Sequence, residues 1–295
     1  MIETCVKESF LDLFYHDVKD LKLNRSNNLN VFTLKITNNS FAYNELIDSL
    51  SNHIYNFALS RTTVEELENI KAYGTLINKA KDKLRRYSSN EGELGEILLY
   101  CLLEAHLDAP KILTKLEIKT AKNDYVKGAD GIHLLKLTEN DFQLIFGESK
   151  LNSDLKKGIY EAFGSLSKLL SENKIDFEIG LIESQLIKET SNPDLYEFLK
   201  KIIIPSAREN SINTDYSFGI FLGFDINISE DELDMSNSKF RNHIREKIKT
   251  NILEVTESIN RQIMKSEFRG YDFHIYIIPF SNLKMVRKEI IKELT

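Results

Sequence analysis

The sequence predicts a protein of the α/β or α+β class, because helical and strand-like segments alternate along the chain. Apolar residues recur at helical spacing in some segments, and others are short, apolar or alternating, as is typical of strands. At 295 residues, 42% hydrophobic and 28% charged, the chain can form one large domain or two modest ones. We predict an N-terminal α/β extension over residues 1–87 and a main domain over residues 88–295.

The N-terminal extension contains one clear strand signal and one clear helix signal. Asn30 to Thr37 alternates as a strand does, after an Asn-rich loop at 24–28. Residues 62–87 are predicted to form a single helix with Thr62 as its N-cap. The end of this helix is basic, and it indicates either a solvated face or a phosphate contact. The basic residues are Lys79, Lys81, Lys83, Arg85 and Arg86.

A second helix is predicted through residues 91–107, and Ser88 and Ser89 can cap its N-terminus. Its apolar residues follow helical spacing, and Glu93 and Glu96 share another face. Strands are predicted at 116–119, 130–137 and 142–151, and the last two form a hairpin around a turn at 138–141.

The rest of the chain continues the alternation of helices and strands. Helices are predicted at 153–172, 193–204, 239–266 and 282–293. Short apolar runs predict strands at 177–183, 218–226 and 273–279.

Composition and missing motifs exclude several classes of protein. With 39 basic and 45 acidic residues the net charge is −6, which disfavours strong unaided binding to DNA. The two cysteines form neither a zinc pattern nor a disulfide framework, and there is no G-x-x-x-x-G-K-[ST] loop for ATP hydrolysis. No apolar run is long enough to span a membrane, and the N-terminus lacks a signal peptide. We therefore expect a cytoplasmic protein with no membrane association.

The predicted hairpin brings chemically useful side chains to one end. Pairing across a turn centred on residues 139 and 140 places Asp130 opposite Ser149, within one residue. Glu148 and Lys150 are two positions apart and share a strand face, while Ser149 points away. Asp130, Glu148 and Lys150 can therefore converge.

Two carboxylates at that distance repel each other and require a compensating positive charge. A divalent cation supplies this charge, and oxygen ligands suit Mg²⁺ or Mn²⁺. Lys150 could then orient a nucleophile or stabilise negative charge in a transition state. Glu96, or else Glu93, could reach the same cation if its helix packs on the hairpin. The residues alone are equally compatible with a simple surface ion pair between Glu148 and Lys150.

The order of these residues resembles the PD-(D/E)xK nuclease core. Glu96 is followed by G-A-D at 128–130 and by G-E-S-K at 147–150. Ala129 stands where the signature has proline, and 17 residues separate Asp130 from Glu148. More specifically, GELGEILLY at 92–100, KGADGIH at 127–133 and FGESKL at 146–151 resemble HamA, the nuclease subunit family of the Hachiman anti-phage system. The resemblance covers about residues 85–295.

This resemblance implies a restriction-endonuclease-like fold, with a mixed central sheet flanked by helices, and a metal-dependent DNA nuclease. The implied catalytic residues are Asp130, Glu148, Lys150 and Glu96. The implied residues of the magnesium or manganese site are Asp130, Glu148, Ser149, Glu96 and Glu93. By the same resemblance the partner would be HamB, a superfamily-2 helicase, and DNA would be degraded when invasion or damage is sensed.

The nucleic-acid contacts and the activity itself remain open at this point. Lys83, Arg85 and Arg86, together with Lys156 and Lys157 after the hairpin, could contact phosphates or lie on solvated helix faces. The chain could be an active nuclease subunit. Alternatively, it could be a nuclease-like binding module that docks on a helicase and restrains it, with weak or no cleavage.

Overall fold

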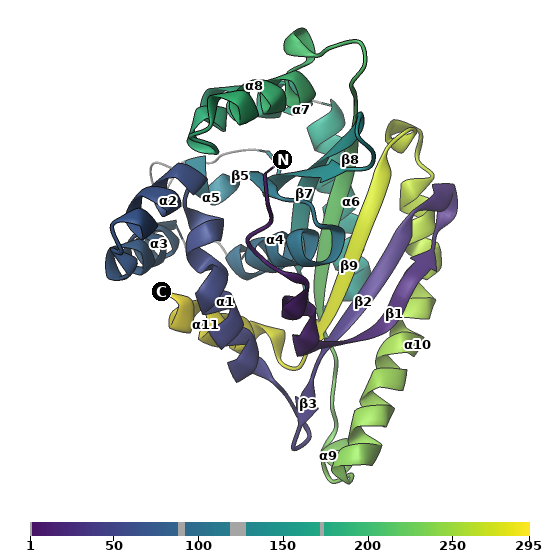
Figure 1. Cartoon of the computed structure of the whole chain (residues 1–295). Helices are drawn as coiled ribbons and strands as arrows, with labels where there is room; N and C mark the ends of the chain where they lie inside the picture. Colours follow the sequence, from purple (N-terminus) through teal and green to yellow (C-terminus); the bar gives the residue numbers. More distant parts are fainter. Residues whose placement is uncertain (1, 88–91, 119–127, 172–173) are drawn as a thin grey trace.

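The fold is built on a seven-stranded mixed β-sheet, with strand order β1-β2-β9-β8-β7-β6-β5 (Figure 1). The computed structural model describes residues 2–87, 92–118, 128–171 and 174–295, without the side chains of Ser26, Arg86, Tyr87 and Ile118. Strands β2, β9, β8 and β7 run parallel, and β1, β6 and β5 pair antiparallel at the two sides. The strands are β1 (Phe14–Lys22), β2 (Asn28–Leu34), β5 (Lys111–Thr114), β6 (Gly131–Lys136), β7 (Asp141–Leu151), β8 (Asn213–Asp225) and β9 (Asp272–Phe280). A separate small hairpin joins β3 (Ile36–Thr37) to β4 (Ser40–Phe41).

Helices cover both faces of this sheet (Figure 1). Helix α4 (Glu93–Leu107) packs so closely on one face that a Cβ added at Gly147 of β7 would lie 3.0 Å from Leu99. Helix α6 (Leu155–Ser171) lies on the other face, beside α10 (Asn237–Ile263). The remaining helices are α1 (Tyr43–Ala58), α2 (Arg61–Asn69), α3 (Tyr73–Tyr87), α5 (Lys115–Ile118), α7 (Lys174–Gln185), α8 (Pro193–Ile203), α9 (Glu230–Leu233) and α11 (Leu283–Leu294). The predicted class, a mixed sheet flanked by helices, is confirmed.

Most of the predicted elements are present. The hairpin is formed by β6 and β7, and α4, α6, α8, α10 and α11 lie where helices were expected. Strands β2, β8 and β9 also match their predicted positions. Ser88 and Ser89, the expected caps of α4, lie outside the described residues. No helix in the described ranges is long and apolar enough to cross a membrane.

The single helix expected over residues 62–87 is instead two helices, α2 and α3. The chain turns at Lys71, which has a left-handed φ of 56°. The amide of Lys71 donates to the carbonyl of Glu68 and that of Ala72 to Leu67, which is the Schellman pattern that ends a helix. The prediction was wrong because a lysine occupies the left-handed position, and the nearest glycine, Gly74, lies three residues later in the first turn of α3. The cap is also different, since Ser60 rather than Thr62 precedes the first turn.

Two predicted strands are helical in the structure, as far as their residues are described; Lys119 lies outside the described residues. The strand expected at 116–119 lies earlier, at β5, and α5 follows it because Thr114 and Glu117 form a capping box. The amide of Glu117 donates to Thr114 Oγ1, and the amide of Thr114 donates to Glu117 Oε2. The strand expected at 177–183 is part of α7, whose buried side chains follow helical spacing.

The N-terminal extension shares the central sheet with the rest of the chain. Its strand β2 pairs in parallel with β9, so that Asn28 faces His274. The extension therefore supplies one side of the same seven-stranded sheet. The boundary at residue 87 stays a prediction.

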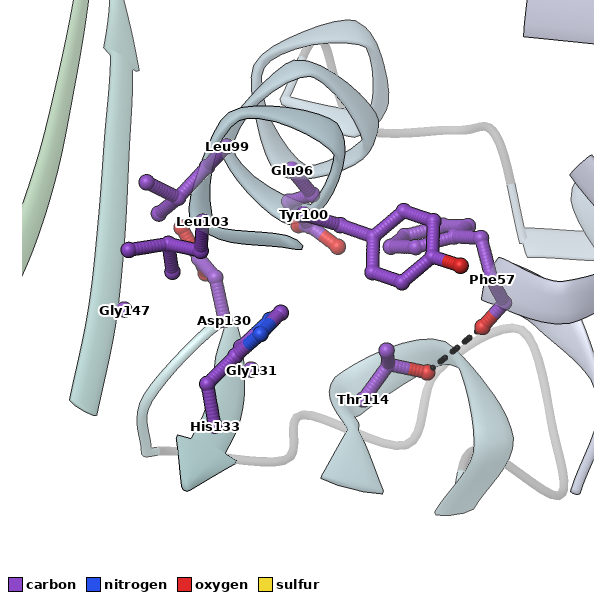
Figure 2. Close-up of a pocket in the computed structure, with 10 residues that line it drawn as sticks. All are labelled: Phe57, Glu96, Leu99, Tyr100, Leu103, Thr114, Asp130, Gly131, His133 and Gly147. Carbon is purple, nitrogen blue, oxygen red and sulfur yellow. Dashed lines mark hydrogen bonds between the residues drawn. The ribbon is translucent and has the colours of Figure 1, made fainter. Parts of the chain in front are cut away.

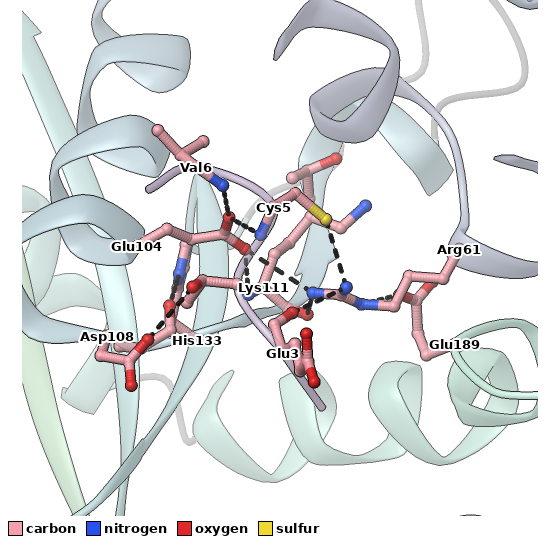
Figure 3. A network of polar contacts seen from close by, with 12 residues as sticks. Glu3, Cys5, Val6, Arg61, Glu104, Asp108, Lys111, His133 and Glu189 are labelled. Atoms are coloured by element: carbon pink, nitrogen blue, oxygen red, sulfur yellow. Dashed lines mark hydrogen bonds and ion pairs between the residues drawn. The ribbon is translucent and has the colours of Figure 1, made fainter. Parts of the chain in front are cut away.

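A buried polar network ties the first residues of the chain to α4 (Figure 3). Glu104 Oε2 accepts hydrogen bonds from the amides of Cys5, at 2.7 Å, and Val6, at 2.8 Å. Glu104 Oε1 accepts from the amide of Lys111 at 2.9 Å and lies 3.6 Å from the guanidinium of Arg61. One carboxylate thus satisfies three backbone donors from two distant segments.

Candidate active site

The β6–β7 hairpin places Asp130 where the sequence predicted it. Ile132 faces Phe146 in the ladder, a register that carries Asp130 to a position beside Glu148. The amide of Asp130 donates to the carbonyl of Gly147 at 2.8 Å. The predicted register placed Asp130 opposite Ser149 within one residue. The observed register places it opposite Glu148, so the prediction is confirmed within that margin.

Ser149 orients the carboxylate of Asp130. Its amide and its hydroxyl donate to Asp130 Oδ2 at 2.8 Å and 2.9 Å. Its side chain lies on the α4 face of β7, where an added Cβ at Gly95 would come 3.0 Å from Ser149 Oγ. Ser149 thus points away from the face shared by Glu148 and Lys150, as expected, yet its hydroxyl reaches Asp130. Two donors on one oxygen restrict the rotation of this carboxylate.

Glu148 and Lys150 form an ion pair between Lys150 Nζ and Glu148 Oε1. Glu148 is only 6% exposed, so this pair is not the exposed surface pair that the residues alone allowed. Burial and the negative charge of Asp130 raise the pKa of Glu148 to about 7, although Lys150 opposes the rise. Burial alone would lower the pKa of Lys150, but the carboxylate of Glu148 raises it. The site therefore holds a crowded, incompletely neutralised acidic group.

Helix α4 adds Glu96 to this group. Glu96 and Asp130 line the same small cavity of about 10 Å³, near the lower limit for holding a single water (Figure 2). Glu96 points from α4 toward Asp130 in this view (Figure 2). Glu93, one turn earlier, is also buried but is not among the described residues that line the cavity. His133, at the floor, is held by the carbonyl of Ala109 at 2.8 Å, and burial lowers its pKa to about 4.

The sequence did not single out Lys115 and Glu178, which also belong to this site. Lys115 Nζ lies 3.4 Å from Asp130 Oδ1. Glu178 of α7 accepts the amide of Ala129 at 3.3 Å, and burial raises its pKa to about 7. The capping-box pattern at 114–117 could have placed Lys115 after a strand, beside the hairpin. No pattern in the sequence indicates Glu178.

The basic residues predicted to bind nucleic acid do not form one group around this site. Lys83 is half-buried and donates to the carbonyl of Glu117 at 2.7 Å, and burial lowers its pKa. Arg85 contacts the carbonyl of Thr295 and, at 3.3 Å, the carboxylate of Asp82. The side chain of Arg86 lies outside the described part of the chain. Lys156 and Lys157 are exposed on the first turn of α6, directly after β7, and Lys157 lies 3.8 Å from Glu161.

The donor atoms of the site suit a hard divalent cation. Asp130, Glu148 and Glu96 offer only carboxylate oxygens, the ligand type that Mg²⁺ and Mn²⁺ prefer. Within the described residues, no three acidic, histidine or cysteine side chains are yet gathered closely enough to hold a metal ion. The chemistry of the residues therefore fits a cation, and side chains must move to complete its shell.

Fold and site together define a mixed α/β protein with carboxylates and lysines clustered at the end of a central hairpin. The chain matches the HamA family over residues 8–294, nearly its whole length. It therefore belongs to the HamA family, a component of the Hachiman antiviral defence system. No curated protein matches the chain.

Proposed function

We propose that this chain is the metal-dependent DNA nuclease subunit of a Hachiman defence complex, with a PD-(D/E)xK core. One observation carries the proposal. Asp130 and Glu148 meet Lys150 at the end of the β6–β7 hairpin, in the arrangement that the E-x-K pattern predicted. The negative charges of Asp130 and Glu148 repel each other, and Lys115 and Lys150 offset them only in part, so a bound cation would relieve the repulsion.

Each residue has a role that follows from its position. Asp130, held by Ser149, and Glu148 would hold Mg²⁺ or Mn²⁺, with Glu96 beside them. A bound cation would supply charge that polarises the scissile phosphate. The Lys150 side chain is partly exposed, so its ammonium can stabilise negative charge that develops on a phosphate at the surface.

The proposed nuclease acts on DNA with a helicase partner, the superfamily-2 helicase HamB. The net charge of −6 repels DNA, and Lys83 is committed to an internal hydrogen bond. The sequence also has no phosphate-binding loop of its own for ATP hydrolysis. We expect weak DNA binding and slow cleavage by the isolated chain at about 150 mM salt, and rapid cleavage with helicase and ATP. Tight binding and rapid cutting by the chain alone would instead indicate a free-standing nuclease. A cytoplasmic location is part of the same proposal.

The decisive experiment compares two acid–lysine pairs on the same hairpin. Glu148→Gln and Lys150→Met should each reduce DNA cleavage by at least about 100-fold in the helicase complex, and abolish phage protection. The matched controls are Glu139→Gln and Lys136→Met, which break an exposed pair at the opposite end of the hairpin. Both controls should retain cleavage and protection.

A second experiment tests whether cleavage requires a divalent cation. Removing divalent cations with EDTA should stop cleavage by the wild-type complex, and Mg²⁺ or Mn²⁺ should restore it. If folded Glu148→Gln protects cells as well as the wild type does, the nuclease proposal is wrong. The chain would then be a module that docks on the helicase and restrains it.

A further inference from the structure

The position of Lys115 is determined by the backbone of the central sheet. Its amide donates to the carbonyl of Asp130 at 3.1 Å, continuing the β5–β6 pairing by one step. Its side chain is 23% exposed and ends 3.4 Å from Asp130 Oδ1. The main chain therefore holds Lys115 beside Asp130, and the flexible four-carbon stem carries the ammonium to the carboxylate.

The ammonium of Lys115 lies in the field of three carboxylates. Burial alone would lower the pKa of Lys115, but Asp130, Glu96 and Glu148 together raise it. These are the three acids to which we assign the divalent cation. Lys150 differs from Lys115 because its ammonium forms an ion pair with Glu148 rather than with Asp130. This pair lies on the strand face opposite to Ser149.

We propose that Lys115 is the resting counter-ion of the candidate site: its ammonium, paired with Asp130, offsets part of the negative charge of the three carboxylates until a divalent cation displaces it. This inference rests on the proposed function. A cation at the shared carboxylates and the Lys115 ammonium would repel each other strongly at such short range. Lys115 is thus a positioning residue that holds the acids together without a metal and weakens cation binding.

The test measures cation binding directly. Mn²⁺ is titrated into the full chain by calorimetry at about pH 8, so that the carboxylates are mostly ionised. Lys115→Gln should bind Mn²⁺ at least about tenfold more tightly than the wild type, because the competing charge is gone. Lys115→Arg keeps the charge and should bind like the wild type. Lys136→Gln removes the same charge from the far, exposed end of the hairpin and should change nothing.

Thermal unfolding gives a second readout that does not depend on cleavage. In EDTA, Lys115→Gln should melt at a lower temperature than the wild type, because the carboxylates lose their counter-ion. Added Mn²⁺ should raise its melting temperature more than that of the wild type. A variant that folds only with Mn²⁺ supports the inference in the same way.

The outcomes separate this inference from the proposed function. If the wild type binds Mn²⁺ and Lys115→Gln binds it equally or more weakly, the counter-ion role is wrong and the cation site stands. If only Lys115→Gln binds Mn²⁺, the inference is supported. If neither binds, the cation site of the proposed function fails, and the counter-ion role fails with it.

Discussion

Replacing Glu104 by alanine should destabilise the folded chain by about 3–5 kcal/mol. Glu104 is 1% exposed, and its carboxylate accepts three backbone hydrogen bonds (Figure 3). The donors are the amides of Cys5, Val6 and Lys111. Val6 and Lys111 are almost fully buried, so water cannot replace the lost acceptor without local opening.

The magnitude follows from these donors. A buried polar group left without its partner costs about 1–3 kcal/mol. Two fully buried amides therefore account for about 2–6 kcal/mol, and the half-buried amide of Cys5 adds less because the first residues can open toward solvent. Loss of the Glu104 carboxylate also removes a negative charge that compensates the positive charge of the Arg61 guanidinium, and this adds to the cost.

The assay is urea unfolding followed by circular dichroism. Glu104→Gln keeps the shape of the side chain but turns one acceptor into a donor. Its free energy of unfolding should therefore lie between those of the wild type and the alanine variant. The control is Glu8→Ala, an exposed glutamate in the same N-terminal segment, which should change stability by less than about 0.5 kcal/mol. A loss below about 1 kcal/mol for Glu104→Ala, with an unchanged urea slope, would refute the reasoning.

Three further predictions concern the candidate site and one ion pair. Gly128→Ala should lower cleavage severalfold, because its Cβ would lie 1.7 Å from Glu178 Oε1 and would push this carboxylate off the amide of Ala129, next to Asp130. Glu96→Gln should weaken Mn²⁺ binding about tenfold, and Glu93→Gln much less, because only Glu96 is among the described residues lining the cavity with Asp130. Glu232→Gln should cost about 1–2 kcal/mol at pH 7, because a hydrogen bond from a lysine ammonium lowers the pKa of Glu232 to about 2. This contribution is present above about pH 4.5 and is lost as the pH falls toward 2. The unfolding free energies of the wild type and Glu232→Gln, measured in urea, should therefore become equal near pH 2.

Each of these predictions has a matched control. Gly164→Ala introduces a Cβ into α6 with no atom within 4 Å, so it should leave cleavage unchanged. Normal cleavage by Gly128→Ala would show that the contact between Glu178 and the amide of Ala129 does not position Asp130. Equal Mn²⁺ affinities for the two α4 variants would remove Glu96 from the site. Glu230→Gln, exposed on the same short helix, should be neutral, and a constant Glu232→Gln effect down to pH 2 would exclude the ionic origin.

The hairpin could be predicted from the sequence because its signals are local. Alternating residues set the two strand faces, and the turn at 138–141 set the register, so the meeting of Asp130, Glu148 and Lys150 followed. Lys115 was missed because its position depends on β5, a non-local neighbour of the hairpin. The strand had been expected at 116–119, and this shift concealed the approach of Lys115 to Asp130.

The prediction failed at α7 for a different physical reason. A short apolar run has no periodicity that separates a buried strand from a helix. Phe177, which made the run look buried, is 55% exposed, whereas Glu178 is buried against the loop before Asp130. The polarity of the residues therefore predicted the wrong buried face. The buried face is set by tertiary contacts, such as that of Glu178 with Ala129, which the local sequence does not indicate.

The pairing of β2 with β9 has a consequence for how the protein is made. The two strands lie side by side although about 240 residues separate them along the chain. At a synthesis rate of about 5–20 residues per second, β2 waits roughly 12–50 s for this neighbour. During that time its apolar edge is open, which invites pairing with other chains. A chain that stops before β9 leaves open edges on both β2 and β8. Incomplete products should therefore aggregate or be degraded, and should not persist as partly folded chains.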